Sequence, residues 1–258
     1  MVKSKELKIM RKKIDKADKV PDPLLTMQHI PIDSLPFSLP DNVRQHLTAL
    51  PQKKSKTKGA DANAGGQGVS DGIAEPSSPP QESSLTLEAV PSSALTDDLV
   101  QRLLTIFEEN MGELYRVSSW GLKLNEKEEE LRHRKARYLL VWEHSTAADD
   151  VPTTTLAAFC HYRFCLDDDE RPDWPVLCIY EIQVASGYQR RGLGQALMRI
   201  LQEIGRQTDM AKVLLTVFSR NVEGIQFYRE KCGYTVDESD PSIYGDHHED
   251  YSILSKVV

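Results

Sequence analysis

Regular patterns of apolar and polar residues begin near residue 85 and continue to the C terminus. Short runs of alternating or continuous apolar residues are typical of β-strands. Apolar residues that recur every three or four positions indicate helices after Thr96, a candidate N-cap, and after Gly192. The predicted strands are residues 85–90, 138–142, 156–164, 176–184, 212–218, 233–236 and 251–257, and a third helix is predicted over residues 222–231.

Strands joined by short loops pair antiparallel, whereas a strand–helix–strand crossover makes parallel neighbours. The pattern therefore predicts an α/β fold with a mixed, mostly antiparallel central sheet flanked by helices. Two further segments are expected outside this sheet. Residues 125–135 are mainly charged and should form a solvated helical turn or two, and residues 149–154 should form a hairpin-type loop.

The chain before residue 85 has a different character. Residues 51–84 contain almost no large apolar side chain, so they cannot bury enough surface to offset the entropy of ordering. We therefore predict a basic arm and irregular brace over residues 1–50, a disordered insertion over 51–84 and a folded domain over 85–258. The arm carries eight Lys and Arg residues against three acids between positions 3 and 19. Such a run fits either a solvated segment or a patch for nuclear targeting or for contact with ribosome or chromatin.

Composition narrows the class of protein. With 258 residues, 40% of them hydrophobic, the chain can bury one substantial core. Its formal net charge of −7 argues against general nucleic-acid binding by the whole protein. The four cysteines have neither Cys-x-x-Cys spacing nor histidine partners, so we expect buried free thiols and no metal. Neither a secretory signal nor a membrane-length apolar run is seen, and we expect a soluble intracellular monomer.

A glycine-containing turn joins the predicted strand 176–184 to the helix after Gly192. Residues 189–194 have the pattern Gln-x-x-Gly-x-Gly, in which Gly192 and Gly194 let the backbone approach a ligand closely. Unpaired N–H groups at the start of the helix make an anion site, to which Arg190 and Arg191 add charge. A tight turn with two helix-entry glycines is the alternative interpretation. The pattern is neither a dinucleotide-binding turn nor a P-loop.

The whole strand–turn–helix string resembles the pyrophosphate-binding loop of the GNAT acetyltransferases, which hold acetyl-CoA there. A second segment, NVEGIQFYREKCGY at residues 221–234, resembles the second GNAT signature, N-x-x-A-x-x-F-Y-x-x-x-G-F, with one extra residue before the closing pair. The resemblance implies a GNAT fold and acetyl-CoA as co-substrate. It implies cofactor binding by Ile182, Gln183, Val184, Gln189, Arg190, Arg191, Gly192, Leu193, Gly194, Asn221 and Phe227.

A narrower resemblance is to the NatD family of N-α-acetyltransferases, carried by LYRVSSWGLK, HYRF, YEIQV, RRGLG, LLTVF and EDYSIL. That family acetylates the N termini of histone H4 and the A-type H2 histone, whose tails begin Ser-Gly-Arg-Gly. Two positions depart from its pattern: Cys165 replaces an Asp and Cys178 replaces a Tyr, so an Arg-binding role has either moved to Asp167 or been lost. The implied substrate-binding residues are Tyr115, Trp120, Asp167, Tyr180, Thr216, Ser239 and Tyr251.

Acetyl transfer to an amine needs a group that removes a proton from the amine. Glu181, beside the glycine turn, is the candidate general base, and a salt-bridged glutamate is its alternative interpretation. Tyr180 should then line the peptide entrance on the opposite face of the strand. Tyr228 is the candidate acid that protonates the leaving thiolate, or else an aromatic residue that packs its helix on the sheet. Backbone N–H groups near residues 182–184 are candidate donors to an oxyanion.

Two acidic clusters, residues 167–170 and the acids between 237 and 250, are either solvated loops or attractors of a cationic tail. The sequence as a whole predicts an N-terminal acetyltransferase for histone tails, in nucleus and cytoplasm. A GNAT enzyme acting on lysine side chains or small amines shares every acetyl-CoA feature and is the alternative. A non-catalytic CoA-binding regulatory domain is a third interpretation.

Overall fold

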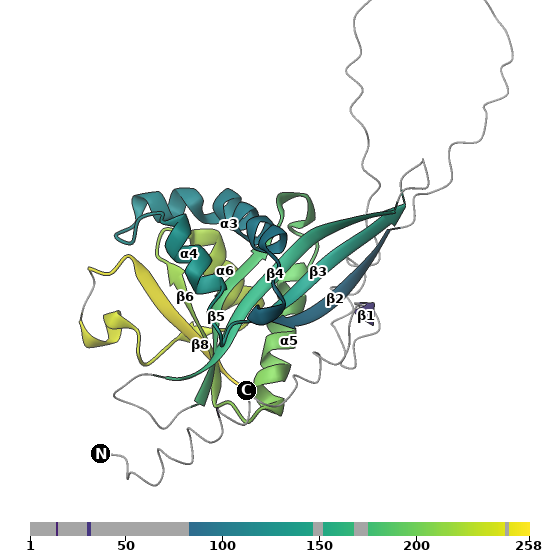
Figure 1. Cartoon of the computed structure of the whole chain (residues 1–258). Coiled ribbons are helices and arrows are strands. Elements are labelled where there is room, and N and C mark those ends of the chain that lie inside the picture. Colours follow the sequence, from purple (N-terminus) through teal and green to yellow (C-terminus); the bar gives the residue numbers. More distant parts are fainter. Residues whose placement is uncertain (1–13, 15–29, 32–82, 147–151, 168–174, 246–247) are drawn as a thin grey trace, which may run out of the picture.

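The computed structural model describes residues 14, 30–31, 83–146, 152–167, 175–245 and 248–258 of the chain (Figure 1). Within them an eight-stranded sheet has the strand order β1-β2-β3-β4-β5-β6-β8-β7. All neighbours pair antiparallel except β5 and β6, which are parallel because helix α5 crosses between them. The α/β fold with a mostly antiparallel sheet and flanking helices is therefore confirmed.

The strands follow the apolar runs of the sequence: β2, β3, β4 and β5 are longer than predicted, β6 and β8 have the predicted bounds, and the strand predicted over 233–236 is confined to β7. Ser83 and Ser84, which the sequence assigns to the insertion, already belong to β2. The strands are β1 (Ile30–Pro31), β2 (Ser83–Pro91), β3 (Arg137–Thr146), β4 (Pro152–Leu166), β5 (Pro175–Val184), β6 (Lys212–Phe218), β7 (Thr235–Val236) and β8 (Tyr251–Val257).

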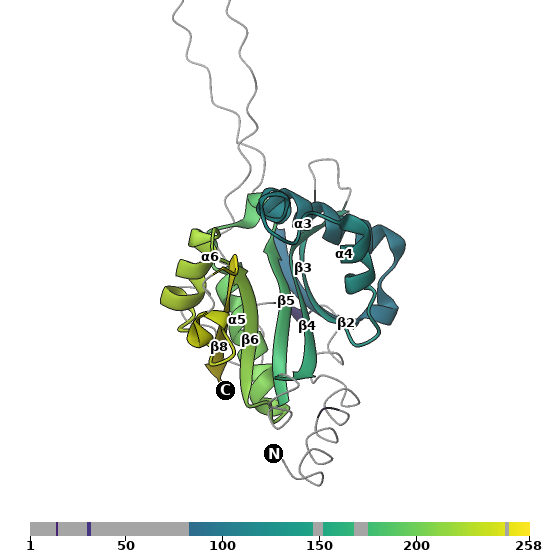
Figure 2. The ribbon, with the colours of Figure 1, turned by 90° about the vertical axis from the view of Figure 1, so that its left-hand side faces the viewer.

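Helices cover both faces of the sheet (Figure 2). On one face α3 (Asp97–Val117) and α4 (Leu124–Leu131) pack on β3 and β4 around Phe107, Tyr138 and Phe159. On the other face α5 (Leu193–Gln207) packs with Leu197, Leu201 and other apolar residues against β4, β5 and β6. Thr96 caps α3 as predicted, since its hydroxyl accepts a hydrogen bond from the Leu99 N–H at 3.2 Å.

The predicted helix over 222–231 has two parts. A short α-helix, α6 (Val222–Gln226), continues as one π-helical turn, Phe227–Lys231, in which the Cys232 N–H donates to the Phe227 carbonyl. A π-helical turn rotates the residues that follow it relative to a regular helix, and such turns are frequent at functional sites. Here it carries Phe227 and Tyr228.

β5 and β6 separate along their length. They pair from Val176 with Lys212 as far as Ile179 with Leu215, and no further pairs follow although both strands continue. β5 stays paired to β4 up to Val184. The edge of β5 that faces β6 therefore carries unpaired backbone groups beyond Ile179, and unpaired strand edges bind other extended chains.

The charged segment 125–135 differs from its prediction. Its residues 125–131 belong to α4, and this helix is not wholly solvated, because Lys127 and Leu131 are both buried. Of the predicted hairpin loop, residues 149–151 lie outside the described residues, and residues 152–154 belong to β4. Among the helices that the structure describes, none is both long and apolar enough to cross a membrane.

Candidate active site

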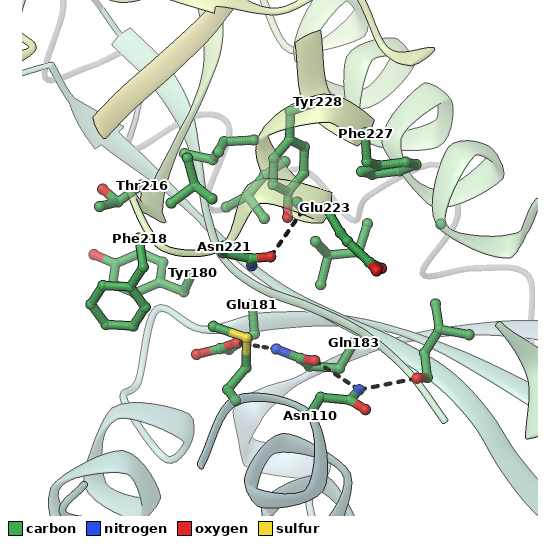
Figure 3. A pocket seen from close by; sticks show the side chains of 18 of the residues that line it. Asn110, Tyr180, Glu181, Gln183, Thr216, Phe218, Asn221, Glu223, Phe227 and Tyr228 are labelled. Carbon is green, nitrogen blue, oxygen red and sulfur yellow. Dashed lines mark hydrogen bonds between the residues drawn. The ribbon is translucent and has the colours of Figure 1, made fainter. Parts of the chain in front are cut away.

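A cavity of about 980 Å³ opens where β5 and β6 diverge. Its lining comes from α3 and α4 on one side, the diverging strands in the middle, and the start of α5 together with α6 and the π-helical turn on the other side (Figure 3). Most predicted site residues meet here. They are Tyr115, Trp120, Tyr180, Glu181, Ile182, Gln183, Val184, Gln189, Arg190, Gly192, Leu193, Gly194, Thr216, Asn221, Phe227 and Tyr228.

The glycine turn forms one end of the cavity. Gly192, the N-cap of α5, has φ 85° and Arg190 has φ 63°, so the backbone reverses sharply before the helix begins. The first N–H groups of α5 lack partners within the helix and point toward the turn. A Cβ on Gly194 would lie 3.2 Å from the Phe227 ring, so glycine allows the two segments to pack. This end suits a phosphate-bearing ligand.

Asn110 of α3 fixes the turn to β5, and the sequence did not indicate it. Its amide donates to the Gln183 side chain and to the Val184 carbonyl, both at 3.0 Å. Gln189 of the turn donates to the same Val184 carbonyl at 3.1 Å. The motif glutamine therefore holds the turn against the end of β5. A polar residue inside the predicted helix stripe was the only signal for Asn110.

Glu181 lies near the middle of the cavity and is 5% exposed. Lys127 of α4 donates to one carboxylate oxygen at 2.7 Å, and the Gln183 amide donates to the other at 2.8 Å. Burial raises the pKa of Glu181 above its ordinary value, while Lys127 and Gln183 oppose that rise. Glu181 therefore combines both interpretations of the sequence: it forms a salt bridge, and it lines the cavity.

Lys127 was missed by the sequence analysis. Its ammonium group also contacts Glu130 at 2.8 Å and lies over the rings of Phe107 and Tyr115. Burial lowers the pKa of Lys127, but the charges of Glu181 and Glu130 raise it by a larger amount. The net shift of the pKa is upward. The signal lay in helical spacing: Lys127 is three residues after Leu124 and four before Leu131, which places it on the buried face.

Tyr180 and Glu181 are neighbours, yet both face α4. Glu181 is opposite His161 of β4, whereas Ile179 is opposite Tyr162, so Tyr180 is the extra residue of a β-bulge. Its ring stacks on His161 at 4.8 Å and lies under the Arg163 guanidinium at 4.0 Å. The prediction that Tyr180 lies on the strand face opposite Glu181 is therefore wrong, because the bulge interrupts the alternation.

His161 supports Tyr180 from below. The ring is fully buried between Tyr138 and Tyr180, and Arg163 donates to its Nε2 at 3.1 Å. Burial and the nearby Arg163 charge lower the pKa of His161 to about 2, so this imidazole is neutral. Burial likewise raises the pKa of Tyr180 to about 12. Tyr180 is held as a neutral phenol in a fixed orientation.

Tyr228 enters the cavity from the π-helical turn, with its hydroxyl on the side toward Asn221 and Glu181 (Figure 3). Burial raises its pKa well above the ordinary value, and the negative charge of Glu181 adds to this rise. The hydroxyl is therefore protonated at neutral pH and able to donate. Asn221 caps α6 by accepting from the Gly224 N–H at 2.9 Å, so its side chain has a structural partner.

Aromatic side chains form the wall opposite the glycine turn. Tyr115 contacts Phe107, Trp120 and Phe218 edge-on, with ring centroids 4.9–6.1 Å apart. Burial raises the pKa of Tyr115 to about 12, and the Glu181 charge adds to the shift. Trp120 remains 43% exposed, so it lies at the mouth of the cavity.

Four predicted site residues lie outside the cavity lining. Arg191 lies over the Tyr188 ring, 5.6 Å from its centroid, and Tyr251 contacts Trp120 at 5.5 Å. Asp167 is engaged by Lys212 at 2.6 Å, and Ser239 donates to Asp237. The structure therefore ties Asp167 and Ser239 into a separate buried network rather than presenting them to the cavity. Of the acidic cluster that follows Asp167, residues 168–170 lie outside the described residues.

The cysteines are free thiols in the described structure. Cys160 and Cys232 are buried, while Cys165 and Cys178 are half-buried. Cys178 lines the cavity, and a hydrogen bond between the two thiols lowers the pKa of Cys165. No group of three or more His, Cys, Asp or Glu side chains in the described parts of the chain is arranged to hold a metal ion.

Family comparison identifies the fold. The model of the acetyltransferase (GNAT) family matches residues 100–234, more than half of the chain. A similar solved structure is the ribosomal-protein-S18-alanine N-acetyltransferase from Escherichia coli, with 19% identity, a TM-score of 0.42, and coverage of 67% of this chain and 94% of that one. PaiA N-acetyltransferase from Thermoplasma acidophilum, solved with coenzyme A, has 17% identity, a TM-score of 0.44, and coverage of 67% and 99%. Ard1 from Thermoplasma volcanium has 17% identity, a TM-score of 0.42, and coverage of 67% and 97%.

Proposed function

The chain belongs to the GNAT acetyltransferase family, and on that premise we propose that it acetylates the N-terminal α-amine of proteins. The proposed substrates are histone H4 and the A-type H2 histone, whose tails begin Ser-Gly-Arg-Gly. As a GNAT acetyltransferase the protein uses acetyl-CoA, which supplies an activated acetyl group on a thioester. The proposed choice of acceptor amine is based on the geometry of the cavity.

One observation carries the proposal: a buried carboxylate and a protonated phenol share a single cavity between the glycine turn and an aromatic wall. Glu181 lies on β5 and Tyr228 enters from the π-helical turn (Figure 3). An α-amino group has a pKa of about 8 and needs only modest help to lose its proton, whereas a lysine side chain has a pKa of about 10.4. A single carboxylate, its pKa raised by burial, suits the α-amine.

The residues divide the work by position. The unpaired N–H groups of β5 beyond Ile179 and the first turn of α5 are suited to hold the pantetheine arm and the phosphates. Arg190 lines the same end and adds positive charge. Glu181 accepts the proton from the substrate amine, directly or through one water. Tyr228 donates a proton to the departing sulfur.

Selectivity for the tail is proposed to reside in the aromatic wall. Tyr115, Trp120, Tyr180 and Thr216 line the cavity on the side away from the glycine turn. Rigid aromatic rings bind an extended, glycine-containing backbone at low entropic cost. Glu130 also lines the cavity, and Asp250, near the mouth, binds Ser119 at 2.7 Å. These acids favour a tail that carries cations.

The first test is to incubate the protein with acetyl-CoA and two peptides beginning Ser-Gly-Arg-Gly-Lys, one with a free N terminus and one already N-acetylated. Mass spectrometry locates any added acetyl group. We expect acetylation of the free α-amine only. Acetylation of lysine in the blocked peptide would move the protein to the class that modifies side chains, and binding of CoA without transfer to either peptide would favour the regulatory domain.

Selectivity is tested by changing the first residues. Peptides that begin with a bulky residue, or that replace the Arg and Lys by Ala, should be poorer substrates if the aromatic wall and the acids select the tail. Trp120→Ala should raise KM for the Ser-Gly-Arg-Gly-Lys peptide more than KM for acetyl-CoA. An equal effect on both would mean that Trp120 supports the fold rather than the peptide.

We also propose that the basic arm directs the protein to the nucleus, or to ribosome or chromatin, while a fraction stays in the cytoplasm. The eight cations between residues 3 and 19 support this, because importers and polyanions bind clustered Lys and Arg. Deleting residues 2–19 and imaging the tagged protein tests it. An unchanged distribution would contradict the targeting role.

A further inference from the structure

Lys127 is the only cation of the described residues that contacts Glu181 in an ion pair, and its own side chain is 8% exposed. Its ammonium group donates to two carboxylates, those of Glu181 and Glu130, and lies over the rings of Phe107 and Tyr115. A buried ammonium group bound by two carboxylates cannot move without losing both ion pairs. Lys127 therefore holds one oxygen of Glu181 in a fixed place.

Gln183 fixes the second oxygen. It donates to Glu181 and accepts from Asn110, which also donates to the Val184 carbonyl at the glycine-turn end of the cavity. Each carboxylate oxygen keeps a second lone pair, so Glu181 can still accept a proton from a substrate amine or from a water. Both oxygens of the carboxylate are thus held in place, and each can still accept one more hydrogen bond.

Burial alone would leave a carboxylate protonated and useless as a base at moderately low pH. Without Lys127 the Glu181 carboxyl would face a second carboxylate, Glu130, and aromatic hydroxyls in an apolar surrounding. The titratable and charged groups around it are Lys127 and Glu130 from α4, Tyr115 from α3, Tyr138 from β3, Cys160, His161 and Arg163 from β4, Tyr180 from β5, and Tyr228 from the π-helical turn.

Among those groups His161 is neutral and Arg163 is occupied by His161, Tyr180 and the Glu130 carbonyl. Lys127 is therefore the group that compensates the charge of Glu181. We propose that Lys127 is a positioning residue of the transfer reaction, whose ammonium group keeps the Glu181 carboxylate ionised and directed into the cavity. This inference rests on the proposed function, in which Glu181 accepts the proton of the substrate amine.

The proton balance is simple. The amine nitrogen forms a bond to the acetyl carbon as the carbon–sulfur bond breaks, and the amine proton passes to Glu181. The departing sulfur takes a proton from Tyr228, and the proton held by Glu181 then passes to the Tyr228 phenolate, directly or through water, so that both residues return to their starting state. Lys127 remains an ammonium throughout, because the charges of Glu181 and Glu130 raise its pKa above the ordinary value in spite of burial. It neither gives nor takes a proton.

The test measures kcat/KM for the free Ser-Gly-Arg-Gly-Lys peptide against pH in the wild type, Lys127→Met and Lys127→Arg. Methionine keeps the length of the side chain but removes its charge. We expect its acidic limb to move up by about one pH unit or more, with activity recovering as the pH rises. Arginine keeps the charge and should restore the limb. Lys123→Met, at an exposed position before α4, is the matched control and should behave as the wild type.

A second readout needs no substrate. At a pH between the acidic limbs of the wild type and of Lys127→Met, infrared spectra should show a protonated-carboxyl band in Lys127→Met that is absent from the wild type and from Lys127→Met combined with Glu181→Gln. A rate lowered equally at every pH, with no such band, would overturn the inference and leave Lys127 a structural residue. The band together with no peptide acetylation by the wild type would instead overturn the proposed function and support the role of Lys127 toward Glu181.

Discussion

Within the described parts of the chain, two buried lysines, Lys127 and Lys212, are each bound by two carboxylates, yet their surroundings differ. Lys127 binds Glu181 and Glu130 inside the cavity, and Lys212 binds Asp167 and Asp237 outside its lining. The carboxyls shift in opposite directions: burial raises the pKa of Glu181, whereas Lys212 and Ser239 outweigh burial and lower the pKa of Asp237 to about 2.

The difference follows from the number of hydrogen bonds. Asp237 accepts from the ammonium of Lys212 and from both the N–H and the hydroxyl of Ser239. Glu181 accepts from Lys127 and Gln183 alone among its described partners. A carboxylate that accepts many hydrogen bonds is stabilised in its ionised form and is a weak base. One that accepts few hydrogen bonds in a buried place keeps a higher affinity for a proton. The comparison therefore separates a structural ion cluster from a site.

The largest expected effect comes from breaking the structural cluster. Lys212→Met leaves Asp167 and Asp237 buried without their ammonium partner, and we expect the free energy of unfolding to fall by about 3–5 kcal/mol. Urea unfolding measures it. Arg206→Ala, which removes an exposed ion pair with Glu203, is the control and should cost under about 1 kcal/mol. Equal losses in the two variants would contradict the distinction.

Breaking the site cluster should act on rate instead. Glu181→Gln keeps the shape of the side chain and its bond to Lys127, so the fold should tolerate it better than Lys212→Met. We expect kcat on the free peptide to fall by about 10²–10⁴-fold. Steady-state kinetics and urea unfolding of the same preparation check both halves. An unaltered kcat would remove Glu181 from the chemistry.

The pH dependence of stability sharpens the comparison. Asp237 has a lowered pKa in the folded state, so its stabilisation is present above its ordinary pKa and is lost as the pH falls through about 2. The advantage of the wild type over Asp237→Asn should thus be about 2 kcal/mol at neutral pH and vanish toward pH 2. Glu181 has a raised pKa in the folded state, so its ionisation lowers the free energy of unfolding as the pH rises. The free energy of unfolding of the wild type should therefore fall relative to that of Glu181→Gln as the pH is raised. Parallel pH profiles for the two pairs would refute the assignment.

The smallest effect concerns the cofactor end, which touches neither lysine. In Gly194→Ala the new methyl group would lie 3.2 Å from the Phe227 ring, so the ring must shift by a few tenths of an ångström. We expect KM for acetyl-CoA to rise by roughly three- to tenfold, about 1 kcal/mol, with stability nearly unchanged. In Gly187→Ala, the control, the methyl group meets no atom within 4 Å. A rise in KM for the control as well would point to the turn as a whole.

The strands and the glycine turn could be predicted from the sequence because they depend on local patterns of residues. The strands were predicted from apolar runs, and the glycine turn from Gly192 and Gly194, since backbone conformation follows residue type at such positions. The assembly of Glu181, Tyr228 and Tyr115 around one cavity was reached through family resemblance. Composition and spacing alone could not place residues from three separate elements together.

What the sequence hid depends on long-range packing. Lys127 lies in a run of charged residues, and charge alone indicates solvent exposure. Only the meeting of α4 with β5, fifty-four residues later in the chain, reveals its partner. The side of β5 on which Tyr180 lies was predicted wrongly for a related reason, because a bulge depends on the partner strand rather than on the sequence of its own strand. Asp167 was predicted to bind substrate, but its carboxylate is paired with Lys212, which lies forty-five residues later in the chain.

The bulge at Tyr180 has a consequence for how such a site can change over generations. Ile179 and Glu181 pair with adjacent residues of β4, so the ladder would remain regular if Tyr180 were deleted. The sheet thus carries one removable position directly beside the Glu181 carboxylate. Insertions normally accumulate in surface loops. Here a single codon could add or remove an aromatic ring in the lining of the cavity while every neighbouring strand kept its register.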